Sequence, residues 1–102
     1  MFELSSEMLE QIQQNADKMG LDVILSSTQE ECAELIQAIS KYNRARGIGQ
    51  RTNIPLEDAE SQLIEELADV KLCIEEILYL TGCDITDMID KKTEKVRKSY
   101  EK

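Results

Sequence analysis

Long stretches without glycine or proline are the feature that most constrains the fold of this chain. Its 102 residues include only four Gly and one Pro. Since these two residue types interrupt helices, their scarcity favours a few long helices over many short strands. Apolar residues recur at helical spacing in four segments. We therefore predict an all-α fold of four helices that forms one domain over residues 1–102.

Glycines mark the ends of the first three predicted helices. These helices are expected over residues 5–18, 22–46 and 56–81, and a fourth follows Asp84 as its N-cap. The fourth helix carries an apolar stripe that consists of Ile85, Met88, Ile89, Val96 and Tyr100. Between the second and third helices we expect a basic connector loop, residues 43–55, which contains Arg44, Arg46 and Arg51.

The charge balance and the missing histidine exclude several classes of function. The chain has 12 Lys and Arg, 21 Asp and Glu, and a formal net charge of −9. A surface of this sign repels phosphate backbones and anionic lipids, so we expect neither a nucleic-acid polymer nor a membrane as partner. The absence of His excludes Ser-His-Asp and Cys-His nucleophile systems and His-ligated metal sites. Any acid, base or metal ligand must be a carboxylate, Lys, Tyr or Cys.

Size, cysteines and hydropathy lead to three further expectations. A lone chain of about 100 residues buries only about 60–65% of its unfolded surface, so we expect a homo-oligomer, either a dimer or a tetramer. Cys32 and Cys73 fall within apolar helical patterns and are expected to be buried thiols. The first residues do not resemble a signal peptide, and no apolar run approaches about 18 residues, so we expect a cytoplasmic protein.

Two carboxylates of the second predicted helix lie in or beside its apolar stripe. At about 100° per residue, Leu35 and Ile39 lie about 40° and 80° around the helix from Glu31. Glu34 lies about 60° from Glu31 in the opposite direction. Glu31 therefore falls among the core-facing side chains, and Glu34 falls at their edge.

The third predicted helix repeats this arrangement. Val70 and Ile74 lie about 40° and 80° from Glu66, and Asp69 lies about 60° away on the other side. Four carboxylates on two facing helices repel one another strongly unless a cation lies among them. Because Mg²⁺ and Mn²⁺ prefer oxygen ligands, we predict a Mg²⁺ site, with Mn²⁺ as an alternative ion, held by Glu31, Glu34, Glu66 and Asp69.

Further charged residues surround this set in the sequence. Glu30 points about 100° away from Glu31, which favours a solvated position but leaves a role as a base open. Lys92 lies inside the apolar stripe of the fourth helix, and Lys95 lies at its edge. Lysines placed in this way either extend over the core or bind phosphate. Lys41, seven residues after Glu34 on the same predicted helix, and Arg51 in the connector are further candidates for substrate contacts.

The motif Glu30-Glu31-x-x-Glu34, followed by Glu66-x-x-Asp69, resembles the signature of MazG-like nucleoside triphosphate pyrophosphohydrolases. This all-α superfamily also includes dimeric dUTPases and phosphoribosyl-ATP pyrophosphohydrolase. The segments 65–70 and 81–100 are similar to the family's third and fourth helices, so the resemblance covers about residues 28–100.

The resemblance implies Mg²⁺-dependent cleavage between the α and β phosphates of a nucleoside triphosphate by a metal-activated water. The products are the nucleoside monophosphate and pyrophosphate, and the implied substrates are dNTPs or non-standard NTPs. The residues that match the metal ligands are Glu31, Glu34, Glu66 and Asp69. The residues that match the substrate-contacting tail are Lys92, Lys95 and Tyr100.

Two departures from the family pattern affect what the resemblance implies. The 31 residues between the half-motifs exceed the usual spacing, because the Arg-rich connector is inserted there. Val96 and Glu101 replace an Asn and a Pro that are frequent in the family. Two alternatives stay open: a non-catalytic helical dimerisation protein of the same fold, and a pyrophosphohydrolase for another phosphorylated nucleotide.

Overall fold

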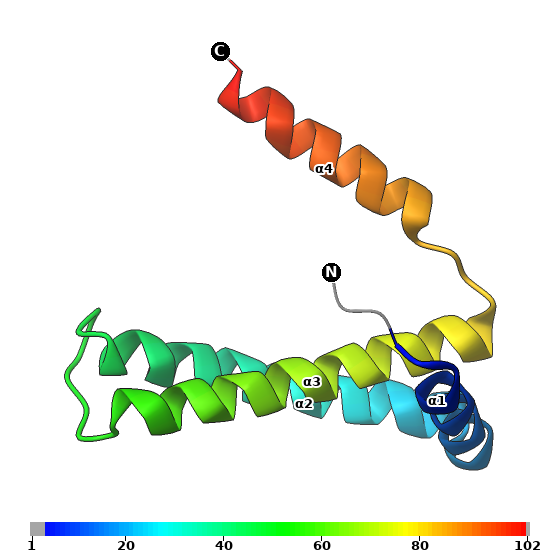
Figure 1. Cartoon of the computed structure of the whole chain (residues 1–102), viewed down its shortest axis with the longest axis horizontal. Helices are drawn as coiled ribbons and strands as arrows, with labels where there is room; N and C mark the ends of the chain where they lie inside the picture. Colours follow the sequence, from blue (N-terminus) through cyan, green and yellow to red (C-terminus); the bar gives the residue numbers. More distant parts are fainter. Residues whose placement is uncertain (1–3, 102) are drawn as a thin grey trace.

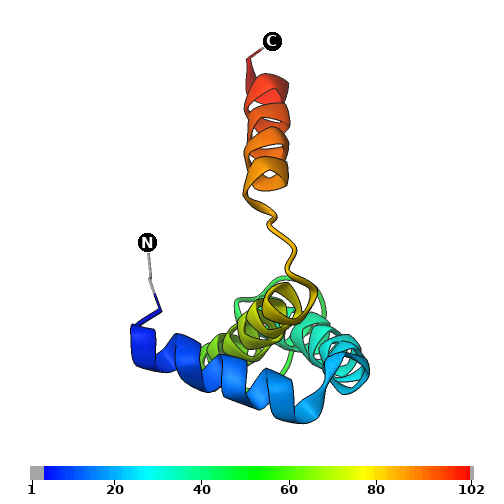
Figure 2. The same cartoon turned by 90° about the vertical axis from the view of Figure 1, so that its right-hand side faces the viewer.

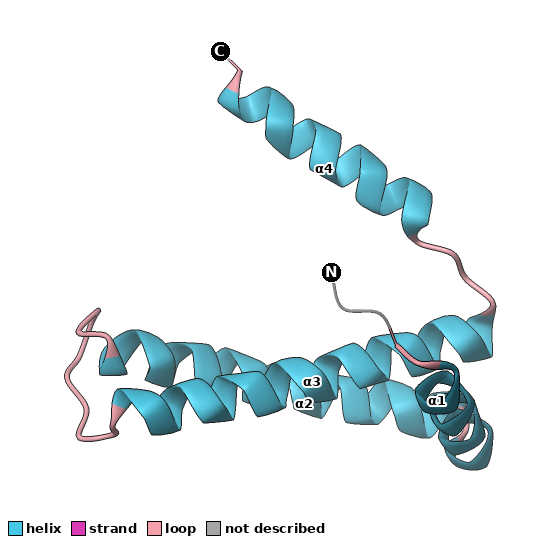
Figure 3. Cartoon of the chain, viewed as in Figure 1, coloured by secondary structure: helices cyan, strands magenta, loops and turns pink. Residues whose placement is uncertain are grey.

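The structure is a computed structural model that describes residues 4–101, and this part of the chain contains four α-helices and no strand (Figure 3). The helices are α1 (Ser6–Met19), α2 (Leu21–Ala45), α3 (Leu56–Thr81) and α4 (Thr86–Tyr100). The prediction of an all-α fold is confirmed, and α3 has the predicted bounds. No helix in the described range is long and apolar enough to cross a membrane.

The structure corrects the start of the predicted connector and the N-cap of the fourth helix. Residues 43–45 belong to α2, so the connector is shorter than expected and spans residues 46–55. Arg44 lies in the last turn of α2, where a cation interacts favourably with the helix dipole. At the start of α4 the N-cap residue is Ile85, and Asp84 stands one position earlier. The Asp84 carboxylate still accepts a hydrogen bond from the backbone N–H of Thr86 at 2.9 Å.

Helices α2 and α3 lie side by side along most of their length, and α1 crosses them near one end (Figure 1). A single residue, Gly20, joins α1 to α2 with a φ of 84°, a backbone conformation that glycine adopts without steric cost. Small aliphatic side chains and one thiol form the buried core of these three helices, namely Ile12, Ala16, Ile24, Ala38, Ala59 and Cys73. In this core α1 packs against the antiparallel pair of α2 and α3.

The two cysteines expected in the core differ in their environments. Cys73 is buried, as predicted, whereas Cys32 is exposed, and the prediction for Cys32 is wrong. Cys32 lies about 100° around α2 from Glu31, and this rotation carries its side chain past the face that contacts α3.

A side-chain hydrogen bond ties α1 to α3, and its removal gives a first prediction. The Tyr79 hydroxyl donates to the Asp17 carboxylate at 2.8 Å. We expect Tyr79→Phe to lower the free energy of unfolding by about 0.5–1.5 kcal/mol, because one solvent-exposed side-chain hydrogen bond is lost. Urea denaturation followed by circular dichroism measures this change. Tyr100→Phe is the control, since the Tyr100 hydroxyl makes no hydrogen bond within residues 4–101. Equal stabilities of the two variants would contradict the prediction.

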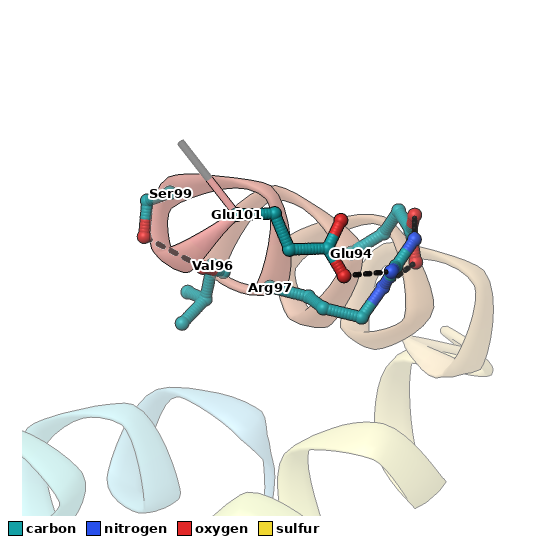
Figure 4. A network of polar contacts seen from close by, with 5 residues as sticks. All are labelled: Glu94, Val96, Arg97, Ser99 and Glu101. Atoms are coloured by element: carbon teal, nitrogen blue, oxygen red, sulfur yellow. Dashed lines mark hydrogen bonds and ion pairs between the residues drawn. The ribbon is translucent and has the colours of Figure 1, made fainter.

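Helix α4 stands away from the other three helices, as the two perpendicular views show (Figures 1 and 2). It contacts none of them within the described range, and none of its residues is buried. Its structure is supported locally by Arg97, which forms ion pairs with Glu94 and Glu101 (Figure 4). The predicted apolar stripe of α4 is exposed in the single chain and does not join its core.

Candidate metal centre and adjoining cavity

The four predicted carboxylates lie midway along the paired helices α2 and α3. Glu31 and Glu34 occupy successive turns of α2, and Glu66 and Asp69 occupy successive turns of α3. Glu31, Glu34 and Glu66 each offer a carboxylate oxygen, and these oxygens all lie within 4.8 Å of one another. Antiparallel pairing explains this convergence, because each pair lies close to the middle of its helix, and the middles of two antiparallel helices of 25 and 26 residues face each other.

Burial and mutual repulsion perturb the acidity of this set. Burial, together with the negative charges of Glu34 and Asp69, raises the pKa of Glu31 from 4.5 to about 7. Burial is also the main cause of the raised pKa of Glu66, and the charges of Glu34 and Asp69 add to it. Asp69 stands outside the three-residue set, but its charge acts on both Glu31 and Glu66. The negative charge here is therefore costly without a compensating cation.

Two oxygens of this site have no partner that could offset the cost of burying them. Glu31 Oε2 and Glu66 Oε2 are both buried and accept no hydrogen bond from any described residue. Buried polar atoms in folded proteins nearly always have a partner. Two unsatisfied carboxylate oxygens from facing helices fit a cation with oxygen ligands, so the donor set matches a hard divalent ion such as Mg²⁺.

A cavity of about 300 Å³ adjoins the carboxylates between α2 and α3. Its lining consists of Glu34, Gln37, Ala38, Lys41, Gln62 and Glu66. Two carboxylates of the set, one cation and two amides therefore face one space. Such a lining offers both charge and directional hydrogen bonds to a polar ligand. A larger hollow of about 410 Å³ lies elsewhere, and Glu76 is its only carboxylate among the described residues.

Gln37 and Gln62 were not among the residues singled out from the sequence. Gln37 follows Glu34 by three residues on α2, and Gln62 precedes Glu66 by four residues on α3. Residues at these spacings share a helix face. The same periodicity that identified the carboxylates could therefore have identified both amides.

The remaining predicted residues lie in different environments. Lys41 lines the cavity, whereas Glu30 on α2 and Arg51 in the connector are exposed. Lys92, Lys95 and Tyr100 are exposed on α4, which contacts no other helix of the same chain within the described range. Within one chain, the structure does not bring these three residues to the carboxylates.

Comparison with known proteins identifies a family. A family model described as the MazG nucleotide pyrophosphohydrolase domain matches residues 19–102, which include every carboxylate of the site and the whole cavity lining. No curated protein and no solved structure matches the chain.

Proposed function

Since the chain belongs to the MazG nucleotide pyrophosphohydrolase family, we propose that it hydrolyses nucleoside triphosphates to the monophosphate and pyrophosphate with Mg²⁺. The proposed substrates among these are dNTPs or non-standard NTPs, as the resemblance of the sequence motif implies. The observation that carries the proposal is the convergence of Glu31, Glu34 and Glu66 oxygens within 4.8 Å. We further propose that the working form is a homo-oligomer.

Each residue of the site has a proposed task. Glu31, Glu34, Glu66 and Asp69 would hold Mg²⁺, with Mn²⁺ as an alternative ion. When bound, the ion supplies positive charge that offsets the phosphates and activates a water molecule near neutral pH. Lys41 lies in the cavity beside Glu34 and would contact a phosphate group, while Gln37 and Gln62 would orient the polar part of the nucleotide. With no His in the chain, positioning and charge stabilisation carry the reaction, as in other phosphoryl transfers.

The roles of the exposed candidates rest on the sequence pattern. Glu30 is proposed as a base and Arg51 as a substrate contact, although neither lines the cavity. Lys92, Lys95 and Tyr100 are proposed as substrate contacts. To contact a substrate bound at the carboxylates, these three residues have to approach them. Either α4 moves toward the carboxylates of its own chain, or it approaches those of another copy.

A panel of substrates tests the proposal. Pyrophosphate release is measured with canonical and modified NTPs, dNTPs and a phosphoribosyl nucleotide, each with Mg²⁺ and with Mn²⁺. Turnover of nucleoside triphosphates supports the proposal, and turnover of the phosphoribosyl nucleotide alone supports the alternative substrate class. If no compound is hydrolysed, the hydrolase proposal fails and the non-catalytic alternative is favoured.

The position of Lys41 gives a second prediction. We expect Lys41→Met to raise KM about 10- to 100-fold, because a charge-assisted hydrogen bond to a phosphate contributes about 1.5–3 kcal/mol. Steady-state kinetics on the best substrate of the panel measures the effect. Lys18→Met is a matched control, because Lys18 is an exposed lysine of α1 that lies outside the cavity. Similar KM values for the two variants would contradict the proposed contact.

A further inference from the structure

A second cavity lies between the paired helices, at the end where α1 crosses them. Its volume is about 410 Å³, which is within the range of small-molecule sites. Ile24 and Ser27 of α2 and Cys73 and Glu76 of α3 line it, and three residues of α1 close its third side. The tasks proposed above leave this cavity without a role.

The helical register places the second cavity directly beside the carboxylates. Ser27 precedes Glu31 by four residues on α2, and Cys73 follows Asp69 by four residues on α3. Each interval corresponds to about 6 Å along a helix axis. Because the helices are antiparallel, both intervals run toward α1, whereas the cavity of Lys41 lies in the opposite direction. The carboxylates therefore lie between two cavities.

Both cavities also lie on the same side of the helix pair. Gln62 of the first cavity and Glu76 of the second lie about 40° and 80° around α3 from Glu66, in the same direction. On α2, Ser27 lies on the same side of the helix contact as Glu34. A nucleotide held at the carboxylates by its α-phosphate can therefore extend along one face, with its terminal phosphates in the first cavity and its base in the second.

Glu76 is a carboxylate of the second cavity that has no partner in the chain. It is half-buried, and burial raises the pKa of its carboxyl without a neighbouring charge or hydrogen bond to offset the effect. The cations of the ion pairs within residues 4–101 are Lys71 and Arg97, and neither pairs with Glu76. A ligand that supplies hydrogen-bond donors would recover the free energy that this burial costs.

The other walls of the second cavity suit the flat body of a base. Ile24 and Cys73 are buried and supply an apolar surface. Ser27 is half-buried on the opposite helix from Glu76 and offers a hydroxyl group. Lys18 of α1 borders the cavity but is exposed, so we assign it no contact with a ligand. The cavity thus combines an apolar surface with polar groups from two helices.

We propose that the second cavity holds the base of the substrate and that Glu76 makes it selective for guanine. A carboxylate has two acceptor oxygens and no donor. Guanine presents two adjacent donors, N1–H and N2–H, one for each oxygen, and its neighbouring O6 accepts from the Ser27 hydroxyl. In adenine, cytosine and thymine an acceptor stands beside the donor, so one carboxylate oxygen would face a lone pair. The inference rests on the proposed function, whose substrate class it narrows.

Titration of the full chain with dGMP, dAMP, dCMP and dTMP, followed by heteronuclear NMR, tests the selectivity. These monophosphates are products of the proposed reaction, so binding is measured whether or not the chain is a hydrolase. We expect dGMP to bind about 5- to 150-fold more tightly than the other three, the range for a bidentate contact with a base. The largest shifts caused by dGMP are expected at the amides of Ser27, Cys73 and Glu76.

Glu76→Gln is expected to reverse the selectivity. A carboxamide offers one acceptor and one donor, which match the amino group and ring nitrogen of adenine. The variant should therefore bind dAMP more tightly than dGMP, whereas loss of a merely structural residue would weaken all four ligands alike. Glu65→Gln is the matched control, because Glu65 is exposed on the same helix and lines neither cavity. This control should keep the preference for dGMP.

A second variant covers the case in which Glu76→Gln loses its helix content, as measured by circular dichroism. Ser27→Ala removes the proposed donor to O6 and is expected to weaken dGMP about 2- to 10-fold while changing dAMP less. An equal effect of Ser27→Ala on both ligands would then contradict the proposed position of the base.

Three results with the wild type or Glu76→Gln would overturn the inference: no binding of any monophosphate, equal affinities for all four, or an unchanged preference for dGMP in the variant. Shifts centred on Gln37 and Gln62 would place the base in the first cavity and would also overturn it. A chain that selects dGMP but releases no pyrophosphate would contradict only the hydrolase proposal. A hydrolase without a preference for guanine would contradict only the selectivity.

Discussion

Replacing Glu66 by Gln is expected to reduce pyrophosphate release by more than about 100-fold while leaving the helices intact. The substitution keeps the size of the side chain and removes one negative charge and one carboxylate oxygen from the converging set. Changing residues that only support a metal ligand already costs about 10- to 100-fold, so the loss of a ligand itself should cost more. Initial rates and circular dichroism, measured on the same preparation, separate activity from folding.

The chain provides a close control for this experiment. Glu65 is the neighbour of Glu66 on α3, is exposed, and lies outside the acidic set. Glu65→Gln makes the same chemical change and should retain the wild-type rate. The non-catalytic alternative makes a different prediction. In that case Glu66→Gln leaves the free energy of unfolding unchanged or raises it, because repulsion among the carboxylates is relieved. Equal rates of pyrophosphate release for the wild type and Glu66→Gln would contradict the proposal that Glu66 is a metal ligand.

Divalent cations are expected to raise the melting temperature of the wild type by about 10 °C or more. An ion at 100 times its Kd adds about 2.7 kcal/mol to the stability of the state that binds it. In a domain of this size, 1 kcal/mol shifts Tm by about 4–8 °C. Differential scanning fluorimetry with Mg²⁺ or Mn²⁺ measures the shift, with NaCl at equal ionic strength as the control for charge screening.

The same experiment has a pH dependence that follows from the acidic set. The pKa of Glu31 rises from 4.5 to about 7 on folding, so between these values the folded state holds a proton that the unfolded state has lost. Stability from this group is complete below the unfolded pKa and is lost as pH rises through the folded pKa. Without divalent ions, Tm should therefore be lower at pH 8 than at pH 5.5, and the increase caused by Mg²⁺ should be larger at pH 8. If Tm changes neither on addition of Mg²⁺ nor between pH 5.5 and pH 8, the result would contradict a buried cation site.

The sequence was sufficient to predict the centre of the site because helical geometry alone determines it. Glu31 and Glu66 each fall in an apolar stripe, and a stripe of a long helix packs against its neighbour. The angular positions of Glu31 and Glu66 therefore predict that both residues lie at the contact between the second and third helices. The bounds of α3 were also predictable, because Pro55 and Gly82 flank it.

The position of α4 could not be predicted in the same way. An amphipathic stripe indicates that a helix face can be buried but does not identify the surface that buries it. The apolar stripe of the fourth helix is typical of a face that packs against a core. Its members Ile85, Met88 and Val96 are nevertheless exposed in the single chain. Cys32 shows the same limit on α2, since a position about 100° from Glu31 lies beyond the face that α3 covers.

The proposed reaction is tested by incubating a nucleoside triphosphate with the wild-type protein and following it by phosphorus NMR, with Mg²⁺ or with a chelator. We predict that, in the presence of Mg²⁺, the resonances of the monophosphate and of pyrophosphate appear at the same time, and that neither appears with the chelator. Release of a diphosphate and inorganic phosphate, equal turnover in the chelator, or no turnover of any nucleotide of the panel would contradict it.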